Sequence, residues 1–251
     1  MKEYTIAITT FSKRYNFLEE TLKKVREFNV ESDVIICING EKDADFNEEY
    51  RKKVLNLCSS YDRVFPIFFI ELRGLSKMWN TCIIHSSTDD VLILNDDIEI
   101  HSGKIFSFTH SHIQKYGEEY KGLTKFNSTF SYFLVNKGLM DEVGYFDERL
   151  LGFGEEDGDI THRLLSMNKG VSDVFVSGLK NIVSTVRHES VARGVGKYSR
   201  FNRSFIQNQK YKASDNGIKG MFSYPCEKIL EDESPYPYES FFAENKAKLF
   251  S

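Results

Sequence analysis

No stretch of this sequence approaches the run of about eighteen apolar residues that a membrane-spanning helix requires. The N-terminus, MKEYTIAITT, also lacks the apolar core and the cleavage site of a signal peptide. Basic runs of the kind that follow a nucleic-acid backbone are missing too, since 33 Lys and Arg against 37 Asp and Glu give a formal net charge of -4. The sequence therefore predicts a soluble, cytoplasmic protein with no nucleic-acid partner.

Cysteine is scarce and scattered. The four cysteines, Cys37, Cys58, Cys82 and Cys226, are widely spaced, and Cys37 and Cys82 lie inside apolar runs. This pattern is typical of reduced thiols packed in a core, and it argues against a disulfide framework or a zinc site.

What the sequence does contain is an alternation of strand and helix patterns over its first 100 residues. The apolar runs YTIAIT, DVIICI, VFPIFFI and VLIL predict strands, and Leu18, Leu22 and Val25 form one stripe of a helix at i, i+4 and i+7. Such alternation predicts an α/β fold with a mostly parallel central sheet and helices on both faces. From residue 194 the periodicity is weak and no repeat is visible, so we expect a C-terminal extension over 194–251 that packs on or covers the domain.

Polar residues follow three of these strands: Thr9 and Thr10, then Asn39 and Gly40, then Asn95, Asp96 and Asp97. Ligands of open α/β sheets bind outside the carboxyl ends of the strands, where these residues would converge. Asp96 and Asp97 repel each other unless a hard cation such as Mg²⁺ or Mn²⁺, together with a phosphate group, compensates their charge. The alternative is an ordinary strand end with solvated acids, and the spacing alone leaves both open.

A second acidic cluster, GEEDGD over 154–159, begins a predicted helix with Ile160, Leu164 and Met167 on one face. Acids in a first helical turn are stabilised by the helix macrodipole whatever else they do. The functional alternative is that one of these carboxylates is a general base that takes the proton of an attacking hydroxyl. His188, after the run IVSTVR, could complete a metal site, although a lone histidine is more often structural.

The order of the motifs resembles the family-2 glycosyltransferases and their relatives with the GT-A fold, over most of residues 4–190. TIAITTFSKR resembles their opening strand and nucleotide loop, and GLSKMWN resembles the segment before their metal strand. VLILNDDIEI resembles the strand that ends in the DXD motif, and VGYFDERLLGFGEEDGDITHRL resembles the stretch that carries the base motif. Each motif is weak alone, but four in this order are specific.

The resemblance implies a domain over 1–193, with a nucleotide-binding half at about 1–100 and an acceptor-binding half at about 101–193. It assigns Asp157 as the general base with Glu156 beside it, on a helix supported by Asp159 and Arg163. The metal ligands would be Asp97 and His188. The predicted nucleotide-binding residues are Thr9, Thr10, Phe11, Arg14, Asn39, Gly74, Asn80, Asn95 and Asp96, and the predicted acceptor-binding residues are Phe153, Gly154 and Glu155.

The activity that the resemblance implies is an inverting, Mn²⁺- or Mg²⁺-dependent transfer of a sugar to a hydroxyl of a glycan or glycolipid acceptor in polysaccharide biosynthesis. A UDP-sugar is the expected donor, and the acceptor would allow peripheral association with a membrane. Two departures bear on the nucleotide: Asn95 stands at the first DXD position, and Ile38-Asn39 stands where the family has an acidic pair. They leave open a catalytically silent nucleotide-sugar binding module. A sugar-nucleotide pyrophosphorylase is a further alternative, but TTFSKRYN lacks the glycines of its phosphate loop.

Overall fold

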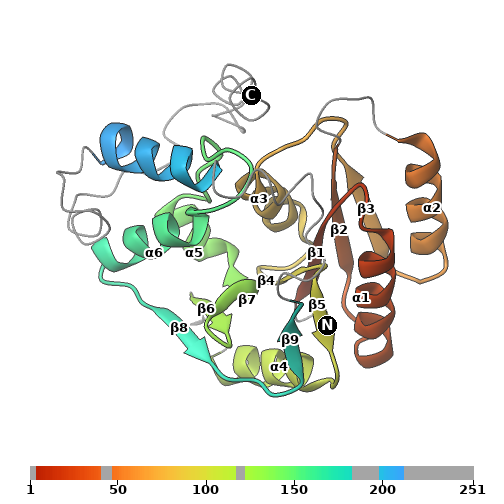
Figure 1. Ribbon diagram of the computed structural model, residues 1–251. Coiled ribbons are helices and arrows are strands. Elements are labelled where there is room, and N and C mark those ends of the chain that lie inside the picture. The colour runs from red at the N-terminus through yellow and green to blue at the C-terminus, as the bar shows by residue number, and fades with distance from the viewer. Residues whose placement is uncertain (1–3, 41–46, 117–121, 183–197, 212–251) are drawn as a thin grey trace. The chain divides into compact units, whose positions relative to one another are not determined.

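The computed structural model of the protein describes residues 4–40, 47–116, 122–182 and 198–211 (Figure 1). The chain divides into two compact units. The first comprises Met1–Leu72, Thr81–Leu139 and Ser172–Val186, and the second comprises Arg73–Asn80, Met140–Val171 and Arg187–Ser251. The predicted boundary between residues 193 and 194 lies outside the described residues.

The central sheet consists of β1 Thr5–Phe11, β2 Val34–Asn39, β3 Val64–Phe68, β4 Asp90–Asn95, β6 Leu123–Phe126, β7 Thr129–Asn136 and β8 Val171–Val174. These seven strands have the order β3-β2-β1-β4-β7-β6-β8. β1 is parallel to β2 and to β4, and β2 is parallel to β3, whereas β7 is antiparallel to its neighbours β4 and β6. The carboxyl ends of β3, β2, β1 and β4 therefore lie at the same edge. The α/β fold predicted from the sequence is confirmed, with antiparallel strands added on one side.

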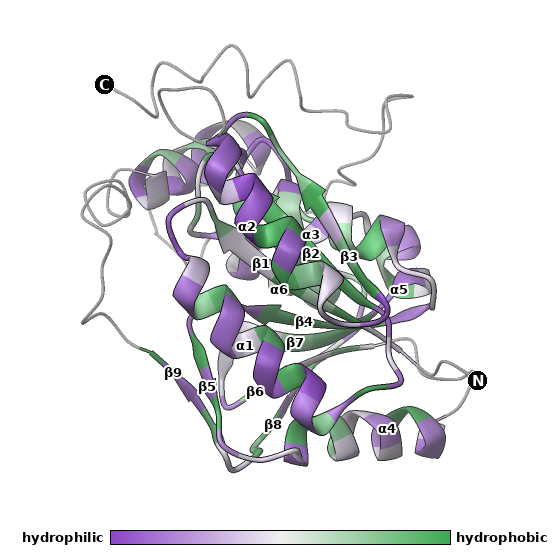
Figure 2. Cartoon of the chain, turned by 90° about the vertical axis from the view of Figure 1, so that its right-hand side faces the viewer, coloured by the Kyte–Doolittle hydropathy of each residue, from purple (hydrophilic) through white to green (hydrophobic). Residues whose placement is uncertain are grey.

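Three helices, α1 Tyr15–Phe28, α2 Glu48–Ser59 and α4 Lys104–Tyr116, share one core with the strands. The predicted stripe of α1, Leu18, Leu22 and Val25, is fully buried in that core. Figure 2 shows α1 and α2 lying over the apolar strands, with their polar faces turned outward. α2 begins at an Asn47 cap, whose side chain accepts hydrogen bonds from the backbone N–H groups of Glu49 and Tyr50. Burial of the apolar stripe drives the packing of these helices more than intrinsic helix propensity does.

The remaining elements are α3 Leu75–His85, β5 Ile98–Ile100, α5 Lys137–Val143, α6 Glu156–Ser166 and β9 Leu179–Asn181, followed by a helix over 198–205 and the π-helical turn η2 Ile206–Lys210. β5 and β9 form a separate antiparallel pair just after the acidic end of β4. Among the described residues, no helix combines the length and the apolar character needed to cross a membrane.

The second unit is organised around the buried side chain of Arg163 on α6. Its guanidinium donates to the carbonyl oxygens of Val143, Gly144 and Tyr145 at 3.1, 2.8 and 2.8 Å, and it pairs with Asp159 at 3.0 Å. These bonds satisfy the carbonyl groups at the end of α5, which would otherwise be buried without partners. Arg163 thereby fixes α6 against the chain that precedes it.

Cys37 and Cys82 are buried free thiols, as predicted, and Cys58 is buried and free as well. Burial raises the pKa of the Cys58 thiol to about 11 and raises that of Cys37 well above its usual value. Such thiols are poor nucleophiles at neutral pH, because the thiolate is the reactive form. Cys226 lies outside the described residues.

Candidate functional site

The ends of β1 and β4 bring the predicted polar residues of the first unit together. Thr9 and Asn95 are partners in the β1–β4 register, and the Thr9 hydroxyl donates to Asn95 Oδ1 at 2.9 Å. The next pair repeats the arrangement, because the Thr10 hydroxyl donates to Asp96 Oδ2 at 2.6 Å. The threonines therefore position the first two residues of the NDD sequence, and Asp97 follows directly.

A guanidinium bridges the two carboxylates. Arg14, the residue that caps the N-terminus of α1, lies 3.0 Å from Asp96 Oδ1 and 3.2 Å from Asp97 Oδ2. Asp96 is 1% exposed and Asp97 is 33% exposed, so the pair is open on the Asp97 side. Burial raises the pKa of Asp96 to about 7, although Arg14 opposes that shift. The end of β4 is thus a site that holds positive charge.

The backbone around the acidic pair is fixed by contacts from several elements. The Thr21 hydroxyl on α1 donates to the carbonyl oxygen of Asp96 at 3.0 Å, and the Ile182 N–H donates to that of Asp97 at 2.8 Å. At the end of β1, the Tyr50 hydroxyl donates to the carbonyl oxygen of Phe11 at 3.0 Å. These bonds hold the strand ends in place without using the carboxylates of the pair.

The carboxylates suit a divalent cation by their chemistry. Mg²⁺ and similar ions prefer oxygen ligands, and they are commonly held by one or two carboxylates while waters and substrate phosphates supply the rest. Asp96 and Asp97 provide two such carboxylates. Within the described parts of the chain, no cluster of three or more His, Cys, Asp or Glu side chains is arranged to hold a metal. His188, the predicted second protein ligand, lies outside the described residues.

Asn39, at the end of β2, is fully buried and uses its side chain locally. Its Oδ1 accepts the N–H of Gly40 at 3.0 Å. Gly40 has no room for a side chain, because a Cβ atom there would lie 2.4 Å from the backbone of Glu71. A role of Asn39 in nucleotide binding stays a prediction.

Gly74 and Asn80, also predicted to bind the nucleotide, belong to the second unit and serve its internal packing. A Cβ atom at Gly74 would lie 2.7 Å from the carbonyl oxygen of Leu150. The Asn80 amide donates to the carbonyl oxygen of Phe146 and to Glu148 at 2.8 and 2.9 Å, and it accepts the N–H of Phe146 at 2.9 Å. These contacts give Asn80 a structural role, and its contact with a nucleotide is untested.

The acidic motif of the second unit forms the N-terminus of α6, and its two catalytic candidates differ in exposure. Glu156 is buried, and both of its carboxylate oxygens lie within 2.8 Å of the N–H of Gly154. Burial raises the pKa of Glu156 to about 8, and the charges of Asp157 and Glu155 add to that shift. Asp157 is exposed and accepts the N–H of Gly158 at 2.9 Å. Of the two, only Asp157 presents its carboxylate to solvent.

The predicted acceptor-binding residues lie in the turn before α6, beside the helix over 198–205. Phe153 packs edge-on against Tyr198 with ring centroids 5.6 Å apart. The carboxylate of Glu155 is already engaged, because Ser199 and Arg203 donate to its Oε1 at 2.6 and 2.8 Å. A direct contact of Glu155 with an acceptor would require those bonds to be exchanged.

A buried charge network, which the sequence did not predict, supports α6. The Lys210 side chain is 0% exposed, and its ammonium lies 2.7 Å from Asp147 and 2.8 Å from Asp159. The Tyr211 hydroxyl donates to Asp159 at 2.8 Å, and Arg149 pairs with Asp147 at 2.8 Å. Lys210 and Arg149 lower the pKa of Asp147, and Lys210 and Arg163 lower that of Asp159, although burial opposes both shifts. Asp147 belongs to the quoted YFDER segment, but no sequence signal marks Lys210.

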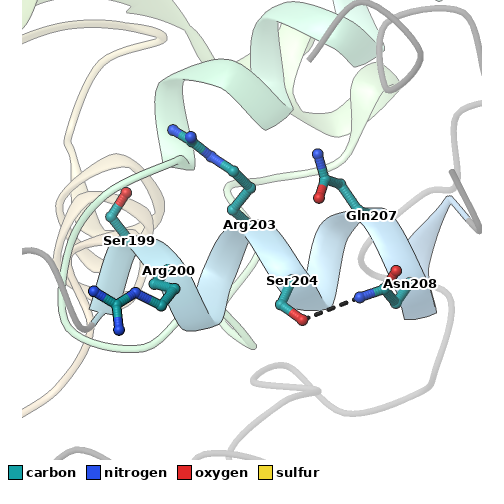
Figure 3. Close-up of a pocket in the computed structure, with 6 residues that line it drawn as sticks. All are labelled: Ser199, Arg200, Arg203, Ser204, Gln207 and Asn208. Atoms are coloured by element: carbon teal, nitrogen blue, oxygen red, sulfur yellow. Dashed lines mark hydrogen bonds between the residues drawn. The ribbon is translucent and has the colours of Figure 1, made fainter. Parts of the chain in front are cut away.

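A cavity of about 420 Å³ lies along residues 199–208 of the second unit (Figure 3). The described residues that line it are Ser199, Arg200, Arg203, Ser204, Gln207 and Asn208. Figure 3 shows Ser199 and Arg203 leaving the same edge of the helix, while the Asn208 amide is bonded to the Ser204 hydroxyl. All six of these side chains carry hydrogen-bonding groups.

A comparison with protein families matches residues 5–115 to a model described as glycosyl transferase family 2. No curated protein matches the sequence.

Solved structures resemble the chain over most of its length. A mannosyltransferase from Pyrobaculum calidifontis, in complex with GDP-Man and Mn²⁺, is 12% identical with a TM-score of 0.62, and the match covers 98% of this chain and 69% of that one. Glucosyl-3-phosphoglycerate synthase from Mycobacterium tuberculosis, in complex with Mn²⁺, UDP and glucosyl-3-phosphoglycerate, is 12% identical with a TM-score of 0.55, covering 81% and 79%. TarS from S. aureus is 14% identical with a TM-score of 0.53, covering 88% and 41%. At these identities the likeness shows the fold, which is the GT-A fold.

Proposed function

We propose that this chain is a glycosyltransferase that moves a sugar from a nucleoside diphosphate to a hydroxyl group with inversion. Its GT-A fold and the match of residues 5–115 to glycosyl transferase family 2 support this proposal. The observation that carries the proposal is the Asp96–Asp97 pair at the end of β4, bridged by a cationic side chain and held by Thr10 of the neighbouring strand. A carboxylate pair that binds a cationic group at this edge of the sheet suits the divalent cation and the diphosphate of a donor.

Asp97 and Asp96 would hold Mn²⁺ or Mg²⁺, which when bound would neutralise the charge that develops on the departing diphosphate. Arg14 would contact the diphosphate, because its guanidinium matches phosphate oxygens and lies at the N-terminus of α1. Thr9, Thr10 and Phe11 would flank the nucleoside from the end of β1. We propose a UDP-sugar as the donor. Similar structures hold GDP-Man in one case and UDP in another, so a GDP-sugar is the alternative to test.

Asp157 would take the proton of the acceptor hydroxyl as that oxygen attacks the anomeric carbon from the face opposite the diphosphate. Its exposed position in the first turn of α6 supports this role, because the carboxylate is accessible to an acceptor hydroxyl. Glu156 is buried beside it and would shape the turn. Phe153 and Gly154 would flank an acceptor of the glycan or glycolipid class.

The test is thermal unfolding of the full chain with UDP or GDP, each with Mn²⁺ and with chelator, followed by transfer assays with the sugar of the stabilising nucleotide. We expect one nucleotide to stabilise the wild type only with metal and to lose that effect in Asp97→Ala, since a ligand at about 100 times its Kd adds about 2.7 kcal/mol. Asp157→Asn should bind the donor normally while turnover falls about 100- to 10,000-fold.

Two results would contradict the proposal. Metal-dependent donor binding without transfer to any acceptor or to water would indicate a silent binding module, the alternative that Asn95 leaves open. Full turnover in Asp157→Asn would exclude Asp157 as the base.

A further inference from the structure

The turn that precedes α6 has a backbone that L-amino acids rarely adopt. Three of its residues have positive φ angles: Gly152 at 58°, Gly154 at 112° and Glu155 at 80°. Glycine tolerates such angles, whereas glutamate has a Cβ atom that makes the left-handed region costly. A strained residue persists only where its surroundings hold it, and strain of this kind gathers at functional sites. Glu155 is the N-cap of α6 and lies two residues before Asp157.

One edge of the helix over 198–205 holds this turn through side chains spaced at i, i+3 and i+4. Ser199 and Arg203 donate to the Glu155 carboxylate, and Figure 3 shows both side chains leaving the helix on the same side. Asn202 is fully buried between them. Its amide donates to the carbonyl oxygens of Leu151 and Gly154 at 2.9 and 2.8 Å and accepts the N–H of Leu151 at 2.7 Å. Both ends of the turn are therefore bonded to one side chain.

The fit is also steric. A Cβ atom at Gly152 would lie 2.4 Å from the ring of Tyr198, so only glycine allows the helix to approach the turn this closely. Tyr198 and Leu151 form a small buried cluster with Phe153 and Phe201 packed against it. Apolar contact and hydrogen bonding thus act on the same turn.

The same segment also holds α6 on the other side of Asp157. Lys210 and Tyr211 bind the carboxylate of Asp159 at 2.8 Å each. Asp157 consequently lies between two residues, Glu155 and Asp159, whose carboxylates are both bound by residues 199–211. Asp157 itself is exposed, and its hydrogen bond to Gly158 lies within its own helix.

We infer that residues 198–211 position the catalytic turn: they hold Glu155 in its left-handed conformation and thereby set the direction in which Asp157 presents its carboxylate. This inference rests on the proposed function, because it takes Asp157 as the base. Ser199, Asn202, Arg203 and Lys210 are positioning residues that touch neither donor nor acceptor in this role. Displacing a reacting group by about 1 Å can cost on the order of 100-fold in rate, so such a device would act on kcat.

Two substitutions of one residue separate positioning from general stability. Glu155→Gly removes the carboxylate but accepts a positive φ, whereas Glu155→Ala removes the carboxylate and keeps the strain. If the segment acts by holding this conformation, Glu155→Ala should lower kcat by on the order of tenfold or more with an unchanged donor KM, and Glu155→Gly should have a clearly higher kcat than Glu155→Ala. The double variant Ser199→Ala/Arg203→Met should behave like Glu155→Ala, and adding Glu155→Gly should restore its kcat.

Matched controls come from α2, where Ser59 and Arg51 make exposed contacts within their own helix. The variant Ser59→Ala/Arg51→Met makes the same chemical changes away from the turn and should leave kcat and donor KM at wild-type values. Equal activity of Glu155→Ala and Glu155→Gly would overturn the inference. So would a double variant that loses donor binding and kcat together without rescue by Glu155→Gly, because that pattern indicates general destabilisation.

Amide hydrogen exchange over residues 151–160 provides a readout that needs no activity. The N–H groups of Gly154 and Asp159 are bonded to Glu156 and to the carbonyl oxygen of Glu155. We expect faster exchange there in Glu155→Ala and in Ser199→Ala/Arg203→Met, and near wild-type exchange in Glu155→Gly. Unchanged exchange in the double variant would show that the segment does not hold the turn, whatever the outcome for the proposed function. If exchange is faster in the double variant as expected but Asp157→Asn keeps full activity, only the assignment of Asp157 as the base is refuted.

Discussion

Glu156 and Asp157 are neighbours in sequence with opposite environments. The pKa of Glu156 is about 8, raised by burial from its usual value of 4.5, whereas Asp157 faces solvent. The folded chain therefore binds a proton at Glu156 over a pH range in which the unfolded chain has lost it. By linkage, this group makes the folded state less stable as the pH rises from about 4.5 to about 8.

Glu156→Gln tests that sign. Glutamine keeps the shape of the side chain and the acceptor for the Gly154 N–H, but it cannot ionise. The free energy of unfolding of the variant should therefore fall less with rising pH than that of the wild type. We expect the free energy of unfolding of the variant to gain about 3 kcal/mol relative to that of the wild type between about pH 5 and about pH 8, measured by urea unfolding at several pH values. Glu49→Gln, at an exposed position in the first turn of α2, is the control and should follow the wild-type curve. A parallel curve for Glu156→Gln would mean that Glu156 ionises normally.

Arg14 would compete with a metal ion, because its guanidinium binds the carboxylates that the ion would use. Arg14→Met should let Mn²⁺ bind the nucleotide-free chain more tightly, since no guanidinium has to leave. The same change should weaken binding of the nucleoside diphosphate in the presence of metal, because a charge-assisted contact is lost. Each effect should be on the order of tenfold by titration calorimetry. Arg51→Met should change neither affinity, and effects of the same sign on both would contradict the assignment.

At the scale of the elements, η2 holds the second unit through Lys210, which pairs with Asp147 and Asp159. Removing one partner of a buried ion pair leaves the other charges uncompensated, so Lys210→Met should lower the free energy of unfolding by about 3–5 kcal/mol. Lys169 pairs with Glu142 at 2.6 Å, but both side chains are partly exposed. Lys169→Met should therefore cost at most about 1 kcal/mol. Equal costs for the two variants would show that the network around Asp147 and Asp159 contributes little.

The elements also show what the sequence could predict. β1, β2 and β4 were predictable because uninterrupted apolar runs are typical of strands buried on both faces, and α1 because its apolar stripe repeats at helical spacing. The short pair β5–β9 and the turn η2 carry no such periodicity. The left-handed φ of Glu155 could not be foreseen, because the sequence has glutamate where that angle favours glycine.

The same limit applies to the candidate sites. The threonines and acids at the ends of β1 and β4 were predictable because parallel strands end at one edge. The bridge from Arg14 depends on how α1 begins, and the contacts of Lys210 join residues that are 63 and 51 positions apart in the chain. Spacing within a motif carries no information about such distant partners.

At the scale of the whole molecule, the second unit draws on three separate stretches of the chain. Leu150 packs with Phe205, Ile206 and Tyr211 in one buried cluster of that unit. A chain that ends at residue 197 loses these contacts along with those of Asn202 and Lys210. We expect amides over 140–171 to lose protection from hydrogen exchange in that shortened chain, while β1, β2 and β4 of the first unit keep theirs. Protection retained over 140–171 would show that residues 198–211 are dispensable for its fold.

The sequence contains a single tryptophan, Trp79, which is buried in the second unit, and the centroids of its ring and that of Phe146 are 4.9 Å apart. The protein therefore carries a fluorophore confined to one of its two units. Tryptophan emission follows the opening of the second unit, while far-ultraviolet circular dichroism follows the helices and strands of both. Plotted against denaturant concentration, the two signals give coincident curves if the units unfold together and separate curves if the second opens first.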